Sequence, residues 1–243
     1  MAELLQWDQT GEREIESGIS KVVLFPWDND NNDYGDGVAW SGVTALNENP
    51  GGADVTDLYA DNIKYATLRA AETFGFTIEA YTYPDEWAEC DGSKAAVAGV
   101  AVGQQTRKAF GLAYRTEIGD DTHPGMDKGY KLHIVYNCTA SPSSRSYSTI
   151  NNSPDAISFS WEGTSTPVAF DDFKSQFKPT SLITIDSTQF TTANGKKNLL
   201  DALEAKLYGT AAVTGTNAAA AVPAELPTPD EVLTTLGYTL PSP

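Results

Sequence analysis

The stretch YKLHIVYNC, residues 130–138, decides the fold class because its side chains alternate in character from one position to the next. Apolar and aromatic side chains occupy the even positions, and Lys131, His133 and Asn137 stand between them. A period of two places neighbouring side chains on opposite faces, so the stretch predicts a β-strand with one buried and one solvated face. The same alternation recurs at residues 76–80, 110–114 and 157–161.

Further strands are predicted at residues 38–46, 63–70 and 182–186. Turn-forming residues, such as Asn49-Pro50-Gly51-Gly52, separate these segments. Because strands outnumber helices, the sequence predicts a mainly β fold, an antiparallel β-sandwich or β-barrel.

Two helices are predicted near the C-terminus. Residues 196–208 place four leucines on one face, and Gly209 follows as a stop signal. Thr228-Pro229-Asp230-Glu231 is a helix start with an N-cap threonine and a glutamate for a capping box. We expect a β-domain over residues 1–209 that includes the first helix, an Ala/Thr/Pro-rich linker or arm over 210–227, and a short helix and tail over 228–243.

The charge balance excludes several classes of function. The chain of 243 residues has 33 acidic and 16 basic side chains and a formal net charge of −17. Gripping nucleic acid or an anionic membrane requires clustered Lys and Arg, so we expect neither kind of binding. We also expect no membrane-spanning segment and no signal peptide, and therefore two reduced cysteines.

The loop WDNDNNDYGDG, residues 27–37, is a candidate calcium site. Asp28, Asp30 and Asn32 occupy the first, third and fifth positions of an EF-hand-like pattern. The sixth position is Asp33 where glycine is needed, and the twelfth is Ala39 where glutamate is needed. We therefore interpret the loop as solvated and anion-repelling, with calcium as the weaker alternative.

Patterns for zinc binding and catalysis are weak or missing in the sequence. Cys90, Cys138, His123 and His133 lack a zinc-ligand spacing, and the alternation predicts that His133 and Cys138 point to opposite faces. The sequence has neither a Gly-x-Ser-x-Gly elbow nor a phosphate-binding loop. We expect no cofactor, no metal and no enzyme activity.

Ten short stretches, spread in order over nearly the whole chain, carry a family resemblance. They are WDQTG (7–11), GVAWSGVT (37–44), LYADNIKY (58–65), FTIEAYTYPDE (76–86), ECDG (89–92), GQQTRK (103–108), FGL (110–112), YKLH (130–133), SPDAI (153–157) and PTPDEV (227–232). Together they resemble the major tail proteins of long, non-contractile-tailed bacteriophages. The aspartate loop and the arm from Thr210 depart from that family.

The resemblance implies a tail tube subunit with a β-sandwich and a flanking helix. Such subunits form hexameric rings that stack into the tube conducting DNA from capsid to host, without binding the DNA specifically. The implied partners are further copies of the chain and the tape measure, tail tip and terminator proteins. The implied location is the virion tail, assembled in the bacterial cytoplasm.

Two sets of residues are candidates for a role in the tube: one for the lining of the bore and one for contact with the next ring. No Lys or Arg occurs between residues 22 and 63, and an acidic bore would let DNA slide without adhering. Glu79 and Glu117 are candidates for the lining of that bore because they alternate away from apolar faces, and the sequence leaves open which solvated face points inward. The predicted loop at residues 47–57 is expected to reach the next ring, through Asn47, Glu48, Asn49, Pro50, Gly51, Gly52, Asp54 and Asp57.

Two other functions remain open at this stage. One is a calcium-dependent carbohydrate-binding β-sandwich in which Trp27, Trp40 or Trp87 stacks on sugar. The other is a different virion β-protein, such as a tube terminator, which would form rings that do not stack.

Overall fold

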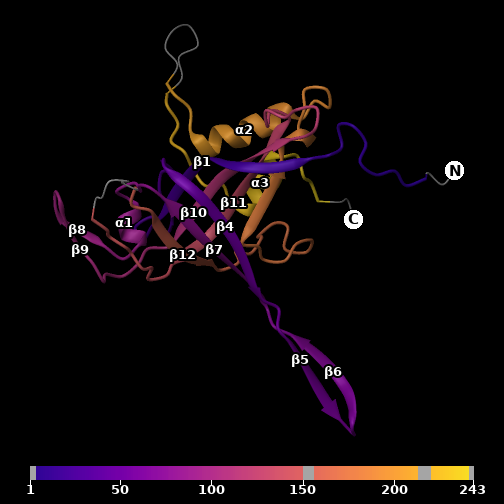
Figure 1. Ribbon diagram of the computed structural model, residues 1–243, viewed down its shortest axis with the longest axis horizontal. Helices are drawn as coiled ribbons and strands as arrows, with labels where there is room; N and C mark the ends of the chain where they lie inside the picture. The colour runs from indigo at the N-terminus through magenta and orange to yellow at the C-terminus, as the bar shows by residue number, and fades with distance from the viewer. Residues whose placement is uncertain (1–3, 150–155, 213–219, 241–243) are drawn as a thin grey trace.

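The computed structural model describes residues 4–149, 156–212 and 220–240 of the chain (Figure 1). Its strands are β1 (Ile15–Asp28), β2 (Asp33–Tyr34), β3 (Val38–Ala39), β4 (Val43–Gly52), β5 (Val55–Ala60), β6 (Ile63–Arg69), β7 (Glu72–Ala80), β8 (Lys94–Val97), β9 (Val100–Val102), β10 (Phe110–Gly119), β11 (Gly129–Ala140), β12 (Phe159–Ser165) and β13 (Leu182–Asp186). Its helices are α1 (Trp87–Cys90), the 3₁₀ turn η1 (Ser187–Gln189), α2 (Lys197–Tyr208) and α3 (Pro229–Thr235). The prediction of a mainly β fold with antiparallel sheets is confirmed.

One large antiparallel sheet organises the molecule. Its strands follow the order β2-β1-β10-β11-β12-β7-β4, with β13 beside β11 and β3 beside β1. Two separate hairpins, β5–β6 and β8–β9, stand outside this sheet. Among the described helices, none is long and apolar enough to cross a membrane.

The main core lies between two parts of the folded sheet. Side chains from β1, β10 and β11 meet side chains from β7 and β12 in one buried cluster. Three tryptophans form its centre, with the ring of Trp40 at 4.6 Å from Trp87 and 5.6 Å from Trp161. The alternation in β7 is confirmed, because Phe76, Ile78 and Ala80 are buried there.

A second core lies on the other face of β1, β10 and β11. Leu200, Leu203 and Leu207 of α2 pack there against residues such as Ile134. The prediction that β10 and β11 each have one solvated face is therefore wrong. α2 and α3 cover the second face, and even Arg115 is buried on it.

The segment that follows α2 returns to the body of the protein. Thr210 pairs with Val222 in an isolated bridge, Gly37 donates its amide to the Ala224 carbonyl at 2.8 Å, and Leu226 is buried. The far end of the predicted arm is thus packed, because Leu226 belongs to the second core. The predicted capping box of the last helix is present at Thr228 and Glu231.

Candidate functional site

The most exposed apolar element is the β5–β6 hairpin, which projects from the body (Figure 1). Its turn is formed by Asp61 and Asn62, both at positive φ (51° and 65°), as a tight type I′ hairpin requires. Its exposed large apolar side chains are Val55, Leu58, Tyr59, Ile63, Tyr65 and Leu68. A lone two-stranded hairpin is marginally stable in water, and a contiguous exposed apolar surface marks an interaction site.

The base of this hairpin continues the ladder of the main sheet. β4 pairs with β7 as far as Gly52 opposite Glu72. Hydrogen bonds from Ala53 N to Ala71 O (3.2 Å) and from Ala70 N to Asp54 O (2.9 Å) carry the ladder into β5 and β6. The main sheet therefore sets the direction in which the β5–β6 hairpin projects.

The predicted loop at residues 47–57 is wrong as a loop. Its residues Asn47, Glu48, Asn49, Pro50, Gly51 and Gly52 belong to β4, Asp57 belongs to β5, and Asp54 lies in the short connection between those strands. Proline is tolerated because β4 is an edge strand, where a missing N–H breaks no ladder bond. The true tip, Asp61-Asn62, carried a usable turn signal that the sequence analysis missed.

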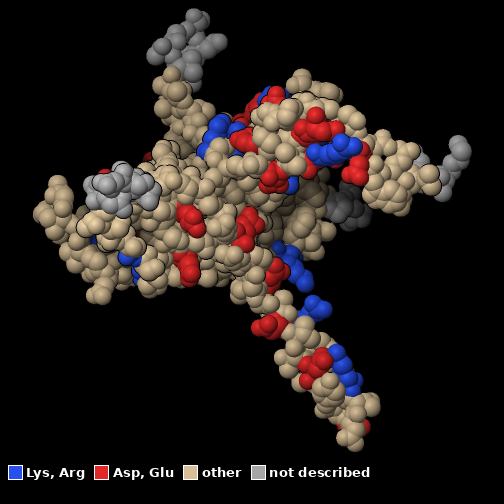
Figure 2. Space-filling model, viewed as in Figure 1, with Lys and Arg blue, Asp and Glu red and all other residues tan. Residues whose placement is uncertain are grey.

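The outward face of β4, β7 and β12 is polar and lacks cations. Glu79 lies on this face, opposite to the buried Ile78, and is paired with Ser160 and Ala45. Glu162 shares the face, since it is paired with Thr77. No Lys or Arg occurs in these three strands. Figure 2 shows red atoms without blue ones where these strands face the viewer.

Glu117 lies elsewhere. It follows Arg115 by two positions on β10, so both side chains point to the α2 side. Its carboxylate accepts a hydrogen bond from the Ser20 hydroxyl at 2.7 Å. Glu79 and Glu117 therefore cannot line the same face of one bore.

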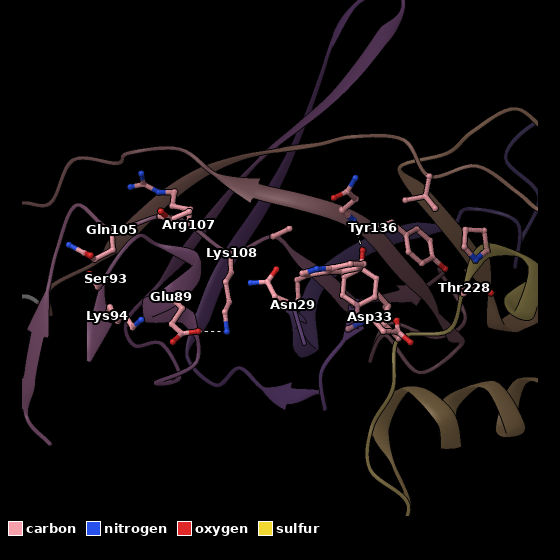
Figure 3. A pocket seen from close by; sticks show the side chains of 18 residues that line it. Asn29, Asp33, Glu89, Ser93, Lys94, Gln105, Arg107, Lys108, Tyr136 and Thr228 are labelled. Atoms are coloured by element: carbon pink, nitrogen blue, oxygen red, sulfur yellow. Dashed lines mark hydrogen bonds and ion pairs between the residues drawn. The ribbon is translucent and has the colours of Figure 1, made fainter. Parts of the chain in front are cut away.

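A cavity of about 820 Å³ opens beside the far end of β1 (Figure 3). Figure 3 shows Lys94, Arg107 and Lys108 toward one end and Tyr136 toward the other, with Asn29 between them. Lys108 pairs with Glu89. This cavity was not predicted from the sequence because its lining comes from six separate parts of the chain.

The aromatic wall of the cavity is built by Trp27 and Tyr34, whose rings meet edge to face at 5.1 Å. The Tyr34 hydroxyl accepts a hydrogen bond from the Asn137 amide at 2.9 Å. Burial raises the pKa of Tyr34 to about 12 and raises that of Tyr136 well above its usual value, so both phenols stay neutral hydrogen-bonding groups.

The candidate calcium loop is the turn of the β1–β2 hairpin. Its residue Asp28 accepts hydrogen bonds from the Asp30 amide at 2.9 Å and from the Asn31 side chain at 2.7 Å. These bonds lower the pKa of Asp28, with the Asp30 amide as the main cause. Asn32 adopts a positive φ of 52° in the turn. The oxygens of Asp28 thus hold the loop together.

The histidine and cysteine candidates do not form one site. The prediction that His133 and Cys138 face opposite sides is wrong, because an irregularity in β11 at Asn137 (φ 46°) reverses the alternation. As a result, Val135 and Cys138 both enter the main core. His133 instead lies near Glu16 and Glu48, each at 3.7 Å, and burial lowers its pKa.

The remaining candidates separate in the same way. Cys90 and Cys138 are buried free thiols, and the pKa of each is raised by burial. His123 binds Asp120 in the β10–β11 turn. In the described parts of the chain, no three His, Cys, Asp or Glu side chains are placed to share a metal ion.

The sugar-stacking tryptophans are mostly internal. Trp40 and Trp87 are 3% and 0% exposed and pack in the main core, so they are not available to a carbohydrate. Of the three, Trp27 borders the cavity of about 820 Å³, and Trp40 borders a smaller one of about 320 Å³ from within the core.

Comparisons with known proteins give little similarity. No protein-family model and no curated protein matches the chain. One solved structure that is similar is the sheath–tube complex of an extracellular contractile injection system in its extended state. The TM-score is 0.28 and the identity 10%, over 68% of this chain and 88% of that chain. No functional conclusion is drawn from so low a TM-score. The proposed function instead rests on the surfaces described above.

Proposed function

We propose that this protein is the major tail tube subunit of a long, non-contractile-tailed bacteriophage, forming hexameric rings that stack into a DNA-conducting tube. The observation that carries the proposal is the β5–β6 hairpin. It extends the β4–β7 ladder away from the body and exposes apolar side chains along its length. Such an element is costly for a solitary chain and useful for one that reaches the next ring.

The cation-free face of β4, β7 and β12 supports the second part of the proposal. DNA carries about one phosphate charge per 1.7 Å of its axis, and Lys or Arg on a bore would bind it through counterion release. Glu79 and Glu162 on a lining without cations repel it instead. The duplex then passes without specific contacts.

The free edge of β4 supports ring closure. Among the described strands, β4 is hydrogen-bonded to β7 alone, so its other edge presents unpaired backbone groups. Pairing of this edge with a neighbouring copy would satisfy them, and a closed ring leaves no edge open. The proposed role needs no cofactor or catalysis, and its partners are other copies and the tape measure, tip and terminator proteins of the virion tail.

Negative-stain electron microscopy of the purified full chain tests the proposal. We expect stacked rings with six subunits each and a central bore. Rings that never stack would favour a tube terminator. A monomer at every concentration, also with other tail proteins present, would contradict the proposal.

A further inference from the structure

The N-terminal arm, defined here as residues 4–10, exposes three large apolar side chains. Leu4, Leu5 and Trp7 are 86%, 73% and 76% exposed. Figure 1 shows the arm leaving the body beyond the beginning of β1. In an extended segment Leu5 and Trp7 point to the same side, so the arm presents an apolar pair.

The arm is anchored at its base, which gives it a fixed point of departure. The Gly11 amide donates to the Asp121 carboxylate at 2.8 Å. Lys128 donates to the Gly11 carbonyl at 3.3 Å and pairs with Glu14 at 2.6 Å. The arm therefore begins at the β10–β11 turn, where β1 starts.

The cavity described above lies at the opposite end of β1, where Trp27 and Asn29 line it. β1 has 14 residues, which at about 3.3 Å each separate its two ends by about 40 Å. The seven residues of the arm reach at most about 25 Å when fully extended. The arm of one copy therefore cannot enter the cavity of the same copy.

The cavity has the chemistry of a peptide site. It offers the aromatic wall of Trp27 and Tyr34 for apolar side chains. Tyr136 is 1% exposed, and among the described residues neither its hydroxyl nor the Arg107 Nε has a hydrogen-bond partner. Both groups can donate to a carbonyl or carboxylate oxygen. A buried donor without a partner destabilises the protein, and an inserted peptide would supply an acceptor for each.

Charge favours the same occupant. At one end of the cavity Lys94 and Arg107 accompany the Lys108–Glu89 ion pair, and Asp33 lines the other end, so that the first end is net positive in a chain whose net charge is −17. The N-terminal residues of the chain carry Glu3 and Asp8 beside the apolar pair and no basic residue before Arg13. The arm thus matches the cavity in both apolar and charged character.

We propose that the N-terminal arm of one copy inserts Leu5 and Trp7 into the cavity of the next copy. Because the two complementary surfaces lie at opposite ends of one chain, the contact is head to tail and repeats from copy to copy. This contact rests on the proposed self-assembly, because it requires a second copy of the chain. It does not depend on the hairpin or on the polar face.

Disulfide trapping in the full chain tests this contact. One preparation carries Trp7→Cys and a second carries Asn29→Cys, and the two are mixed under assembly conditions and oxidised. Cys90 and Cys138 are buried and do not compete. We expect a cross-linked heterodimer between the two preparations. The matched control is Tyr65→Cys, 75% exposed on the other projection, which should not link to Asn29→Cys.

A second measurement uses deletion of residues 1–8, which lie before the anchor. The thermal midpoint of the monomer should not change, whereas the protein concentration required for assembly should rise about tenfold or more. Tubes that form normally without the 7–29 cross-link would overturn arm docking and leave the tube proposal intact. A cross-link in assemblies that are not tubes would support docking and contradict the tube proposal.

Discussion

Arg115 is the charged side chain that fastens α2 to the sheet. It lies over the Tyr130 ring at 3.9 Å, donates to the Tyr208 hydroxyl at 3.0 Å and pairs with Glu204 at 2.5 Å. Its side chain is 8% exposed, so Arg115→Met strands the Glu204 carboxylate in a largely buried place. We expect a loss of about 2–3 kcal/mol in the free energy of unfolding, measured by urea denaturation.

The matched control for Arg115→Met is Lys206→Met, which removes a cation from α2 itself. Lys206 pairs with Glu231, but the two side chains are 32% and 49% exposed. Solvent screening limits such a pair to less than about 1 kcal/mol. Equal losses for the two variants would show that burial does not decide the contribution of Arg115.

The hydrogen bonds of Asp120 predict that acid destabilises the β10–β11 turn, at the base of the N-terminal arm. Hydrogen bonds from Thr122 and then from Lys128 hold the pKa of its carboxyl well below the usual value. The folded-state pKa lies below the unfolded value of about 3.9, so the carboxylate stabilises the fold above that pH. This contribution is lost as the pH falls below about 4 toward the folded-state pKa. Between about pH 5 and pH 3, the thermal midpoint should fall more steeply for the native chain than for Asp120→Asn.

Glu79 tests the electrostatic role of the polar sheet face. Glu79→Lys should leave tubes intact, because the side chain points away from the core. In a ring every copy adds its lysine, so DNA should leave the tube more slowly, with an effect that weakens as salt is raised. Asp201→Lys on the exposed side of α2 is the matched control and should leave the rate of DNA release unchanged. An unchanged rate for Glu79→Lys as well would argue against an acidic bore on this face.

The projecting hairpin yields the main prediction at the level of elements. Replacing residues 54–70 by Asn-Gly joins Ala53 to Ala71, which already face each other, through a type I′ turn. The hairpin contributes no residue to either core, so the free energy of unfolding should change by less than about 1 kcal/mol. Rings should form and fail to stack, as seen by electron microscopy and sedimentation.

The control for the deletion keeps the hairpin and alters its tip. Asp61→Asn with Asn62→Gly introduces the turn pair that type I′ geometry favours most, so stacking should persist. Tubes of ordinary length from the deletion variant would exclude the hairpin as the stacking element.

Elements were predictable where local pattern and burial agree. The alternation in β7 and the capping box of α3 were both read correctly from sequence. β10 and β11 were predicted as strands, but not their second buried face, because α2 comes from a distant part of the chain. The reversal at Asn137 was not predictable either, since one irregular residue changes every later side chain to the other face.

At the scale of the whole molecule, most of the surfaces to which we assign a role in assembly could not be predicted from the sequence. Glu79 was predicted to lie on a solvated face, and the structure places it on one. The cavity and the projecting hairpin were missed. A cavity depends on how separate segments converge, and Asn49–Gly52 looked like a turn although an edge strand accepts those residues.

The net charge of the molecule predicts how assembly responds to salt. A ring of six copies would carry six times −17, or −102 formal charges, so subunits repel one another as they approach. The proposed contacts are mainly apolar side chains and backbone hydrogen bonds, which salt screens little. Raising the ionic strength from about 0.01 M to about 0.15 M shortens the screening length from about 30 Å to about 8 Å. Sedimentation velocity should therefore show a lower concentration threshold for assembly at the higher salt. The opposite trend would mean that ion pairs between copies, and not the apolar contacts of the hairpin and the arm, dominate the assembly.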